Sequence, residues 1–351
     1  MNKFCLFLLL ILITNGAFAQ NVKFDNPSLK TILISQGLDK NKDGEIQISE
    51  VEKVDTLDLE DKLVEINSFN EIVHFKNLTY LNLKSSKIEK LDLSQNTKLV
   101  TFLGTYGQFN ELILSNNPNL ESIYLDGNYE NNGNYNRVEN IPFDKLPKLK
   151  IFKGLQCPLV NVDLSQNIEL QEITFVASKL KTVILPTNNN SKLEKIDIRG
   201  VFNIYDKYSA GFFGQLDFSN CLKLKKVAIT SVGIKGINLI NCTNLEVVDL
   251  MTNSINELIL PDNSNINFLR LDNNPITKLT IGNSPMLKEV TCVGRGNMVT
   301  NLDISKAVNL GEFNFGGSIT NLTCIKNQIN KIKKNPNQWK IAQNWVITIV
   351  K

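Results

Sequence analysis

The sequence predicts an α/β-type solenoid, a coil of short repeats with a parallel β-sheet along its concave side. One repeat spans residues 244–261, and a second with the same apolar spacing follows about 21 residues later. A unit this short cannot bury its own leucines, so it must stack between the turns above and below it. The matching positions are Leu245, Val248, Leu250, Asn253, Ile255, Leu258 and Leu260 in the first repeat, and Ile266, Leu269, Leu271, Asn274, Ile276, Leu279 and Ile281 in the second.

The period extends over most of the chain. Six of the nine steps between successive L-x-L anchors are 21 residues long. We therefore expect a solenoid over residues 57–324, with ten or eleven turns that stack into a rod of about 50 Å, because adjacent strands lie about 4.8 Å apart. The anchors are Leu91, Leu112, Ile141, Val162, Val183, Leu216, Ile237, Leu258, Leu279 and Leu302.

The composition disfavours nucleic-acid binding and most histidine-dependent catalytic and metal sites. The net charge of +3 is small for 351 residues, so no strong field favours nucleic acid as a partner. His74 is the only histidine, which removes most Ser-His-Asp, Cys-His and histidine-rich metal sites. Five of the six cysteines follow the leader, and their register places them inside the coil, although Cys221 and Cys242 could stack closely enough to pair.

Residues 1–19 have the features of a signal peptide. Lys3 precedes an apolar run from Phe4 to Ile13, and residues 17–19 form a small-x-small cleavage site. The run is short for a bilayer span, although an uncleaved membrane anchor is the alternative. We expect an exported protein that is not inserted in a membrane after signal cleavage.

Residues 20–56 predict a small helix-loop-helix unit that caps the first turn. Its loop matches the pattern D-x-[DN]-x-[DN]-G-x5-E and so resembles an EF-hand calcium loop. That resemblance implies Ca²⁺ as the cofactor, with ligands from alternate positions and a glycine, Gly44, at the sharp turn. The implied ligands are Asp39, Asn41, Asp43, Glu45 (through its backbone carbonyl), Gln47 (through a water) and Glu50. The alternative is a polar turn without metal. EF-hands usually work in pairs, so a lone loop suits a structural clamp better than a calcium switch.

The L-x-x-L-x-L-x-x-N repeat resembles the leucine-rich repeat family, in a bacterial form whose repeat divides into two similar halves. The resemblance covers roughly residues 57–324 and implies recognition of a protein most often, and of a glycan or host surface sometimes. It also implies polar residues at fixed turn positions, where asparagine can bond backbone groups. We call each row of such residues, one per turn, a ladder. One such row would hold Asn96, Asn117, Asn167, Asn188 and Asn263, together with Cys221 and Cys242. The other would hold Asn128, Cys157, Asn253 and Asn274.

Two repeats carry insertions. One spans Tyr129 to Asn140, after the expected ladder residue Asn128, and the other spans residues 202–214. The second is rich in aromatic residues, which supply contact area at little entropic cost and make it a candidate binding loop. These rings could instead fold back on the flank of the solenoid. They are Phe202, Tyr205, Tyr208, Phe212 and Phe213.

The concave sheet face is the second candidate surface. Residues that flank the inward leucines should point outward and form an apolar patch with charges of both signs, which suits a protein partner. The alternative is an ordinary solvated face. The candidate residues are Tyr124, Asp126, Val247, Asp249, Met251, Phe268, Arg270 and Asp272.

Residues 325–351 should form a short C-terminal cap. Ile325, Ile329 and Ile332 lie on one helical face, and residues 345–350 alternate like a strand. Without such a cap, the last turn would expose an apolar end and an open sheet edge. We therefore expect an exported, non-enzymatic binding protein, with a glycan- or host-surface-binding adhesin as the alternative. A calcium-switched signalling module or an enzyme is less favoured.

Overall fold

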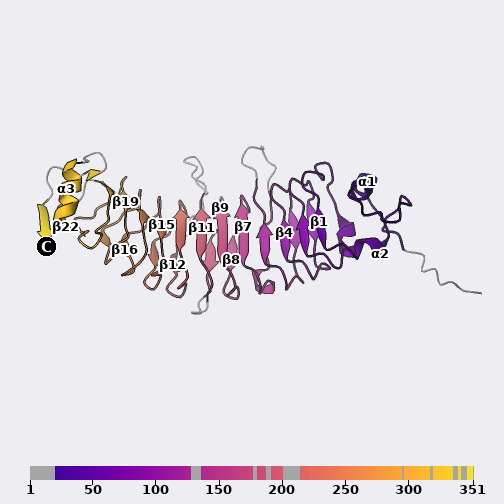
Figure 1. The fold of residues 1–351 in the computed structure, drawn as a ribbon, viewed down its shortest axis with the longest axis horizontal. Helices are drawn as coiled ribbons and strands as arrows, with labels where there is room; N and C mark the ends of the chain where they lie inside the picture. Colours follow the sequence, from indigo (N-terminus) through magenta and orange to yellow (C-terminus); the bar gives the residue numbers. More distant parts are fainter. Residues whose placement is uncertain are drawn as a thin grey trace, which may run out of the picture.

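The protein forms an elongated coil of stacked turns, with α1 at one end and β24 at the other (Figure 1). This computed structural model describes residues 20–127, 136–176, 180–186, 191–200, 214–294, 296–316, 319–334, 339–340 and 346–350. The candidate aromatic residues of the second insertion lie outside these ranges.

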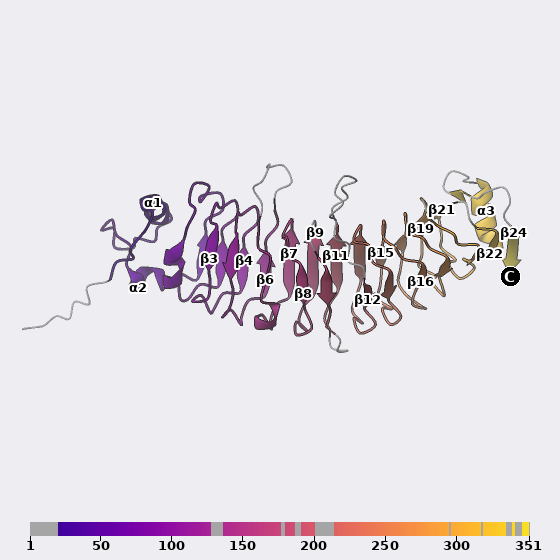
Figure 2. The ribbon, with the colours of Figure 1, turned by 180° about the vertical axis from the view of Figure 1, so that it is seen from behind.

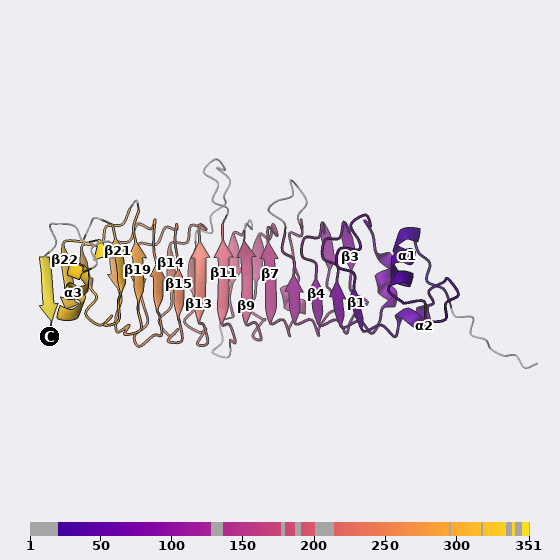
Figure 3. The same ribbon diagram turned by 45° about the horizontal axis from the view of Figure 1, so that its top comes forward.

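One long parallel sheet runs the length of the coil and faces the viewer in Figure 3. Within the described residues it contains 13 strands, more than the ten or eleven turns expected. Two strands, β1 and β2, precede the first anchor, Leu91, and β23 adds a strand from the C-terminal cap. The strands are, in spatial order, β1 (Thr56–Asp58), β2 (Tyr80–Asn82), β4 (Thr101–Leu103), β6 (Ser122–Tyr124), β7 (Ile151–Leu155), β9 (Glu172–Val176), β11 (Lys195–Arg199), β13 (Lys226–Thr230), β15 (Val247–Asp249), β17 (Phe268–Arg270), β19 (Glu289–Cys292), β21 (Glu312–Phe315) and β23 (Trp339–Lys340).

The second half of each repeat forms a shorter row of strands behind the long sheet, as the turned view in Figure 2 shows. These strands pair in small parallel groups rather than in one sheet. The groups are β3 (Lys90–Asp92) with β5 (Glu111–Ile113), β8 (Asn161–Asp163) with β10 (Thr182–Ile184), β12 (Gln215–Asp217) with β14 (Gly236–Asn238), β16 (Glu257–Ile259) with β18 (Lys278–Thr280), and β20 (Asn301–Asp303) with β22 (Asn321–Ile325) and β24 (Val346–Val350).

Helices are few. Helices α1 (Pro27–Ser35) and α2 (Ile48–Val51) form the N-terminal cap, and α3 (Lys326–Lys334) follows β22. Short 3-10 helices η1 (Asn70–His74) and η2 (Phe143–Lys145) lie against the second-row strands β3 and β8. The repeats are therefore joined by turns and short strands, so the fold is a β-solenoid rather than a coil of alternating strands and helices.

The hydrophobic core is a stack of columns, one residue per turn. In the central column, Val248 pairs with Leu269, and Leu269 pairs with Val290, each at the middle of its strand. All three side chains are inaccessible to solvent. The alternating burial along each strand follows from the two-residue period of β structure, so the L-x-L spacing points its leucines into the coil.

Buried asparagines satisfy the backbone where the chain turns. Asn274 donates from Nδ2 to the carbonyls of Leu250 (2.8 Å) and Leu271 (3.0 Å), and its Oδ1 accepts from the Ile255 N–H (3.2 Å). In the other row, Asn117 donates to the carbonyls of Leu93 (2.9 Å) and Asn96 (3.1 Å), while its Oδ1 has no partner. The two rows thus share a donor role but differ in whether the amide oxygen is used.

One ladder assignment from the sequence is wrong, and two others, Asn128 and Asn188, lie outside the described residues. Asn136 makes bonds of the ladder kind: it donates to the carbonyls of Gly104 and Leu125, and it accepts from the Phe109 N–H. Asn263 is exposed with a left-handed φ of 57°, and Ser264 takes the buried position beside it.

A glutamine in the C-terminal cap makes the same pair of backbone hydrogen bonds as the ladder asparagines. Gln328 on α3 donates to the carbonyls of Ile304 (2.8 Å) and Ala307 (2.9 Å), at the same sequence separations as the bonds of Asn96 to Ile72 and Phe75. The sequence analysis did not identify this role, because Gln328 lies in a helix beyond the repeats and is not an asparagine.

Candidate functional site

The N-terminal cap presents the predicted calcium loop between two short helices. Asn26 caps α1 by accepting the Ser28 N–H at 2.9 Å, and Pro27 occupies the first helical position. Leu38, just before the loop, and Ile46, within it, are both buried and attach the loop to the core. The backbone of residues 20–22 bonds to Ile46 and Ile48 and closes the loop from the outside.

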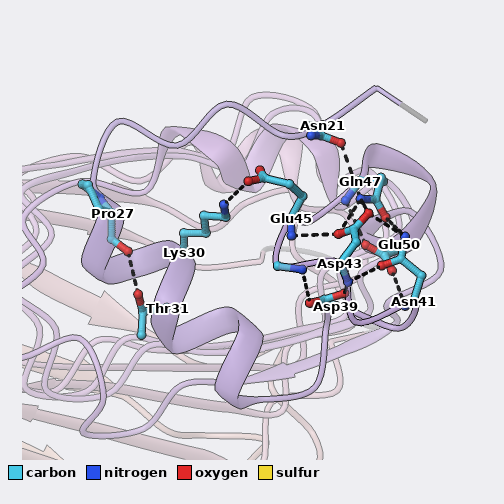
Figure 4. A network of polar contacts seen from close by, with 11 residues as sticks. Asn21, Pro27, Lys30, Thr31, Asp39, Asn41, Asp43, Glu45, Gln47 and Glu50 are labelled. Atoms are coloured by element: carbon cyan, nitrogen blue, oxygen red, sulfur yellow. Dashed lines mark hydrogen bonds and ion pairs between the residues drawn. The ribbon is translucent and has the colours of Figure 1, made fainter. Parts of the chain in front are cut away.

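Most of the predicted ligands lie together at one side of this loop (Figure 4). Asp43 Oδ2 accepts from Asn41 Nδ2 at 2.8 Å and from Gln47 Nε2 at 3.0 Å. Asp39 accepts the backbone N–H groups of Lys42 (2.7 Å) and Gly44 (3.0 Å), which holds the turn at Gly44, where φ is 81°. The backbone N–H of Glu45 and the Asn41 amide hold the pKa of Asp43 below its ordinary value.

Glu50 and Glu45 have separate roles. Glu50 is buried and accepts the N–H groups of Lys40 (2.7 Å) and Gln47 (2.9 Å), so it closes the loop and caps α2. The Glu45 side chain pairs with Lys30 at 2.6 Å. The ligand that the EF-hand resemblance implies at this position is the backbone carbonyl, not the side chain.

This donor set fits calcium in its chemistry, since every predicted ligand offers oxygen. In the arrangement described, hydrogen bonds to amides and backbone N–H groups engage the carboxylates. Among the described residues, no three His, Cys, Asp or Glu side chains are grouped closely enough to hold a metal ion.

The outer face of the long sheet carries the other predicted site residues. Its middle section is a chain of paired charges. Lys153 lies over the Tyr124 ring at 5.7 Å and also contacts Glu172 at 3.2 Å, and Glu172 bonds to Lys195 at 2.6 Å. Burial acts to raise the pKa of Glu172, but the two lysines outweigh it and hold the pKa below its ordinary value.

Two of the predicted contact residues are mainly structural. Asp126 is half-buried and accepts the Leu155 N–H at 3.1 Å, and burial raises its pKa despite that bond. Asp272 is only 9% exposed and is held by the Val293 N–H (2.8 Å), by Thr291 Oγ1 (3.1 Å) and by Arg270 Nε (3.1 Å). Both aspartates therefore support the neighbouring turn, and Asp272 also fixes the orientation of Arg270.

The C-terminal third of this face combines apolar and acidic side chains. One outward row runs Val247, Phe268, Glu289 and Glu312 on four successive strands. Asp249 and Met251 lie beside it, and both are partly exposed. Burial and the neighbouring Glu312 raise the pKa of Glu289.

The sequence did not single out Glu289 and Glu312. Neither forms an ion pair within the part of the chain that the structure describes, although Lys288 is close in sequence. The repeat pattern could have identified both as outward-facing residues. Each directly precedes an inward apolar position, in the same register as Val247 and Phe268.

Five cysteines lie inside the described coil as free, buried thiols. Cys242 donates to the Phe218 carbonyl at 3.2 Å in the ladder position. Burial raises the pKa of the Cys157, Cys242 and Cys292 thiols to about 12 each. These side chains are therefore protonated core residues, and Cys221 and Cys242 are not joined.

Comparison with solved structures identifies the fold. The functional domain of InlJ from Listeria monocytogenes, described as including a cysteine ladder, superposes with a TM-score of 0.59 at 19% identity. That match covers 79% of this chain and 57% of the InlJ chain, so this chain spans little more than half of that length. The internalin InlF from Listeria monocytogenes matches with a TM-score of 0.51 at 20% identity, over 89% of this chain and 93% of that one.

The fold is a leucine-rich repeat solenoid of the kind seen in these internalin structures. No protein-family model and no curated protein sequence matches the chain. Among the described residues, no helix is long and apolar enough to cross a membrane.

Proposed function

We propose that this protein is an exported, non-enzymatic binding protein that recognises a protein partner on the outer face of its long sheet. The binding region would be the C-terminal sheet surface, which we define as Val247, Asp249, Met251, Phe268, Arg270, Glu289 and Glu312. One observation carries this proposal: two apolar side chains and two acidic ones occupy a single row on adjacent strands.

The row has the chemistry of a contact surface rather than of a catalytic site. Asp249 accepts a turn N–H from Met251 at 3.2 Å, and Asp272 is engaged by three donors, so neither is placed as a free base. A partner that covers Phe268 gains burial of an aromatic ring, which contributes on the order of 2 kcal/mol.

The surplus of carboxylates indicates the charge of the partner. Asp249 lies opposite Arg270 on the neighbouring strand, and Asp272 forms an ion pair with it. Glu289 and Glu312 lie opposite each other on the next two strands. Burial and, after it, the neighbouring Glu312 raise the pKa of Glu289, so both disfavour its ionised form. A lysine or arginine from the partner would relieve that repulsion and form a charge-assisted hydrogen bond. The surface therefore fits a peptide segment that carries basic and apolar side chains.

Peptide selection tests this proposal. A random peptide display library would be selected on the protein, and the enriched peptides measured by calorimetry against Phe268→Ala and the double variant Glu289→Gln/Glu312→Gln. We expect peptides with basic and apolar residues, and at least a tenfold loss of affinity in each variant. Ile259→Ala and Glu257→Gln are matched controls, because they remove similar groups from β16 on the opposite strand row.

Equal binding by all four variants would move the site away from the C-terminal sheet surface. Selection of no peptide, with binding on a glycan array that depends on Phe268, would favour the adhesin alternative. The aromatic insertion, with Phe202, Tyr205, Tyr208, Phe212 and Phe213, remains a proposed second contact, and deletion of residues 202–214 tests it in the same assays.

A second proposed property is calcium binding in the N-terminal cap. The convergence of Asp39, Asn41, Asp43, Gln47 and Glu50 supports it, together with the carbonyl of Glu45. A bound calcium ion would supply positive charge that ties these oxygens together. We propose that it clamps the cap on the first turn, without switching the fold.

A further inference from the structure

Among the described residues, one strand edge at the far end of the coil has no partner strand. Strand β24 bonds to β22 on one side and is the last strand of its three-stranded sheet in the described chain. All five of its residues are exposed, and four of them are β-branched apolar residues. Their exposed fractions are 62% for Val346, 38% for Ile347, 55% for Ile349 and 36% for Val350.

The register shows that part of this exposed surface belongs to the core. Ile347 pairs with Leu322, and Ile349 pairs with Cys324. Leu322 and Cys324 are fully buried, so the two isoleucines continue inward columns of the coil that no further described turn covers. An open apolar edge of this kind promotes pairing with another strand unless it is protected.

The backbone of β24 presents a symmetric set of free groups. The Val346 N–H donates to the Thr320 carbonyl at 2.7 Å, so Val346, Thr348 and Val350 direct their backbone groups toward β22. Ile347 and Ile349 therefore direct theirs toward the open edge. These two N–H and two C=O groups lie evenly on either side of Thr348.

The sequence of the strand has the same symmetry. Residues 346–350 read Val-Ile-Thr-Ile-Val, which is identical in both directions. An antiparallel pair centred on Thr348 would place Ile347 opposite Ile349 of the second copy and Val346 opposite Val350. A two-fold interface requires a surface that is complementary to itself, and this strand meets that requirement in both side chains and backbone.

We propose that two copies of this chain join end to end through antiparallel pairing of their β24 strands. The outward groups of Ile347 and Ile349 form the four inter-strand hydrogen bonds. The two Thr348 residues form the central non-hydrogen-bonded pair. The isoleucines from both copies meet on the inner side and cover the two open coil ends.

Charge opposes this contact and gives it a distinctive salt dependence. After Glu312 the sequence has six lysines and no acidic residue. Two caps of the same sign repel each other, and added salt screens that repulsion. The dimer therefore becomes tighter as salt increases, which is opposite to the behaviour of an interface held by ion pairs.

Cross-linking tests the register directly. In a non-hydrogen-bonded antiparallel pair the two Cα atoms lie about 4.5 Å apart, within disulfide range. Oxidation of Thr348→Cys should therefore give a covalent dimer. Val346→Cys is the matched control, because its two copies would lie about 14 Å apart along the antiparallel strands, too far for a disulfide. Equal cross-linking of both variants, or of neither, would overturn the proposed pairing.

Sedimentation velocity tests the association itself. We expect the protein to dimerise with increasing concentration and salt, and Ile347→Lys/Ile349→Lys to raise the dissociation constant at least tenfold. Ile240→Lys, which adds a lysine at another exposed isoleucine, should leave it unchanged. A protein that remains monomeric up to about 100 µM at both low and high salt would refute the proposal.

Discussion

Replacement of Asn274 by alanine probes the ladder that holds successive turns together. The substitution removes three good hydrogen bonds, two from Nδ2 to the carbonyls of Leu250 and Leu271 and one from the Ile255 N–H to Oδ1. A fourth, from Nδ2 to the Asp272 carbonyl, is long at 3.5 Å and adds little. At about 1 kcal/mol for each bond, the loss of unfolding free energy is about 3 kcal/mol.

Asn117→Ala is the matched control within the same chain. It removes two bonds, worth about 2 kcal/mol, but it also removes a buried Oδ1 that has no partner. Removal of this unpartnered buried oxygen restores about 1–3 kcal/mol of unfolding free energy. The net loss of unfolding free energy in Asn117→Ala should therefore be below about 1 kcal/mol. Alanine is already found at the corresponding position in Ala307, which is fully buried.

Urea unfolding followed by circular dichroism measures both variants against the unmodified protein. The midpoint should fall markedly for Asn274→Ala and little for Asn117→Ala, with the same dependence on urea in each case. Equal destabilisation by the two substitutions would refute the assignment of different roles to the two amide oxygens.

The remaining predictions concern the core, the cap and the thiols. Leu250→Ala should cost about 2–5 kcal/mol because Leu250 is fully buried, and a loss under about 1 kcal/mol in urea unfolding would contradict the register. Calcium at twenty times its dissociation constant should stabilise the protein by about 2 kcal/mol; a melting temperature unchanged by chelator, or a response retained in Asp39→Ala, would exclude the clamp. The thiols of Cys157, Cys242 and Cys292 have pKa values raised to about 12 by burial, whereas unfolded thiols ionise near about 8.5. The folded state therefore retains more protons over this range, and stability should fall as pH rises from about 9 to about 12, by up to about 1.4 kcal/mol per pH unit for each thiol. Unfolding measured across this range should show a weaker pH dependence when the three residues are replaced by alanine, and an unchanged dependence would contradict their burial.

The ladder shows how far sequence reasoning reached. Period and spacing placed Asn117, Asn253 and Asn274 inside the coil, because a buried polar residue at a turn must bond to the backbone. They failed at Asn263, where a one-residue shift places Ser264 in the buried position instead. Neither spacing nor composition identified Gln328, because its amide reaches the ladder from a helix outside the repeat.

The candidate sites show the same division. The loop pattern brought Asp39, Asn41, Asp43 and Gln47 to one place, because their spacing in a tight turn leaves little alternative. The sheet face was only partly predictable. Its outward residues follow from alternation. The supporting role of Asp272 and the position of Glu289 beside Glu312 depend instead on neighbours in adjacent turns, about 20 residues away in sequence.

The sequence by itself determined the coil, since a 21-residue apolar period can be buried only by stacking, and it determined which residues face inward. The tertiary structure decided which side chains of adjacent turns contact each other. It placed Glu289 beside Glu312, engaged Asp272 with the next strand, and left the symmetric β24 edge open. These properties arise between turns, where strand pairing brings together residues that no local pattern links.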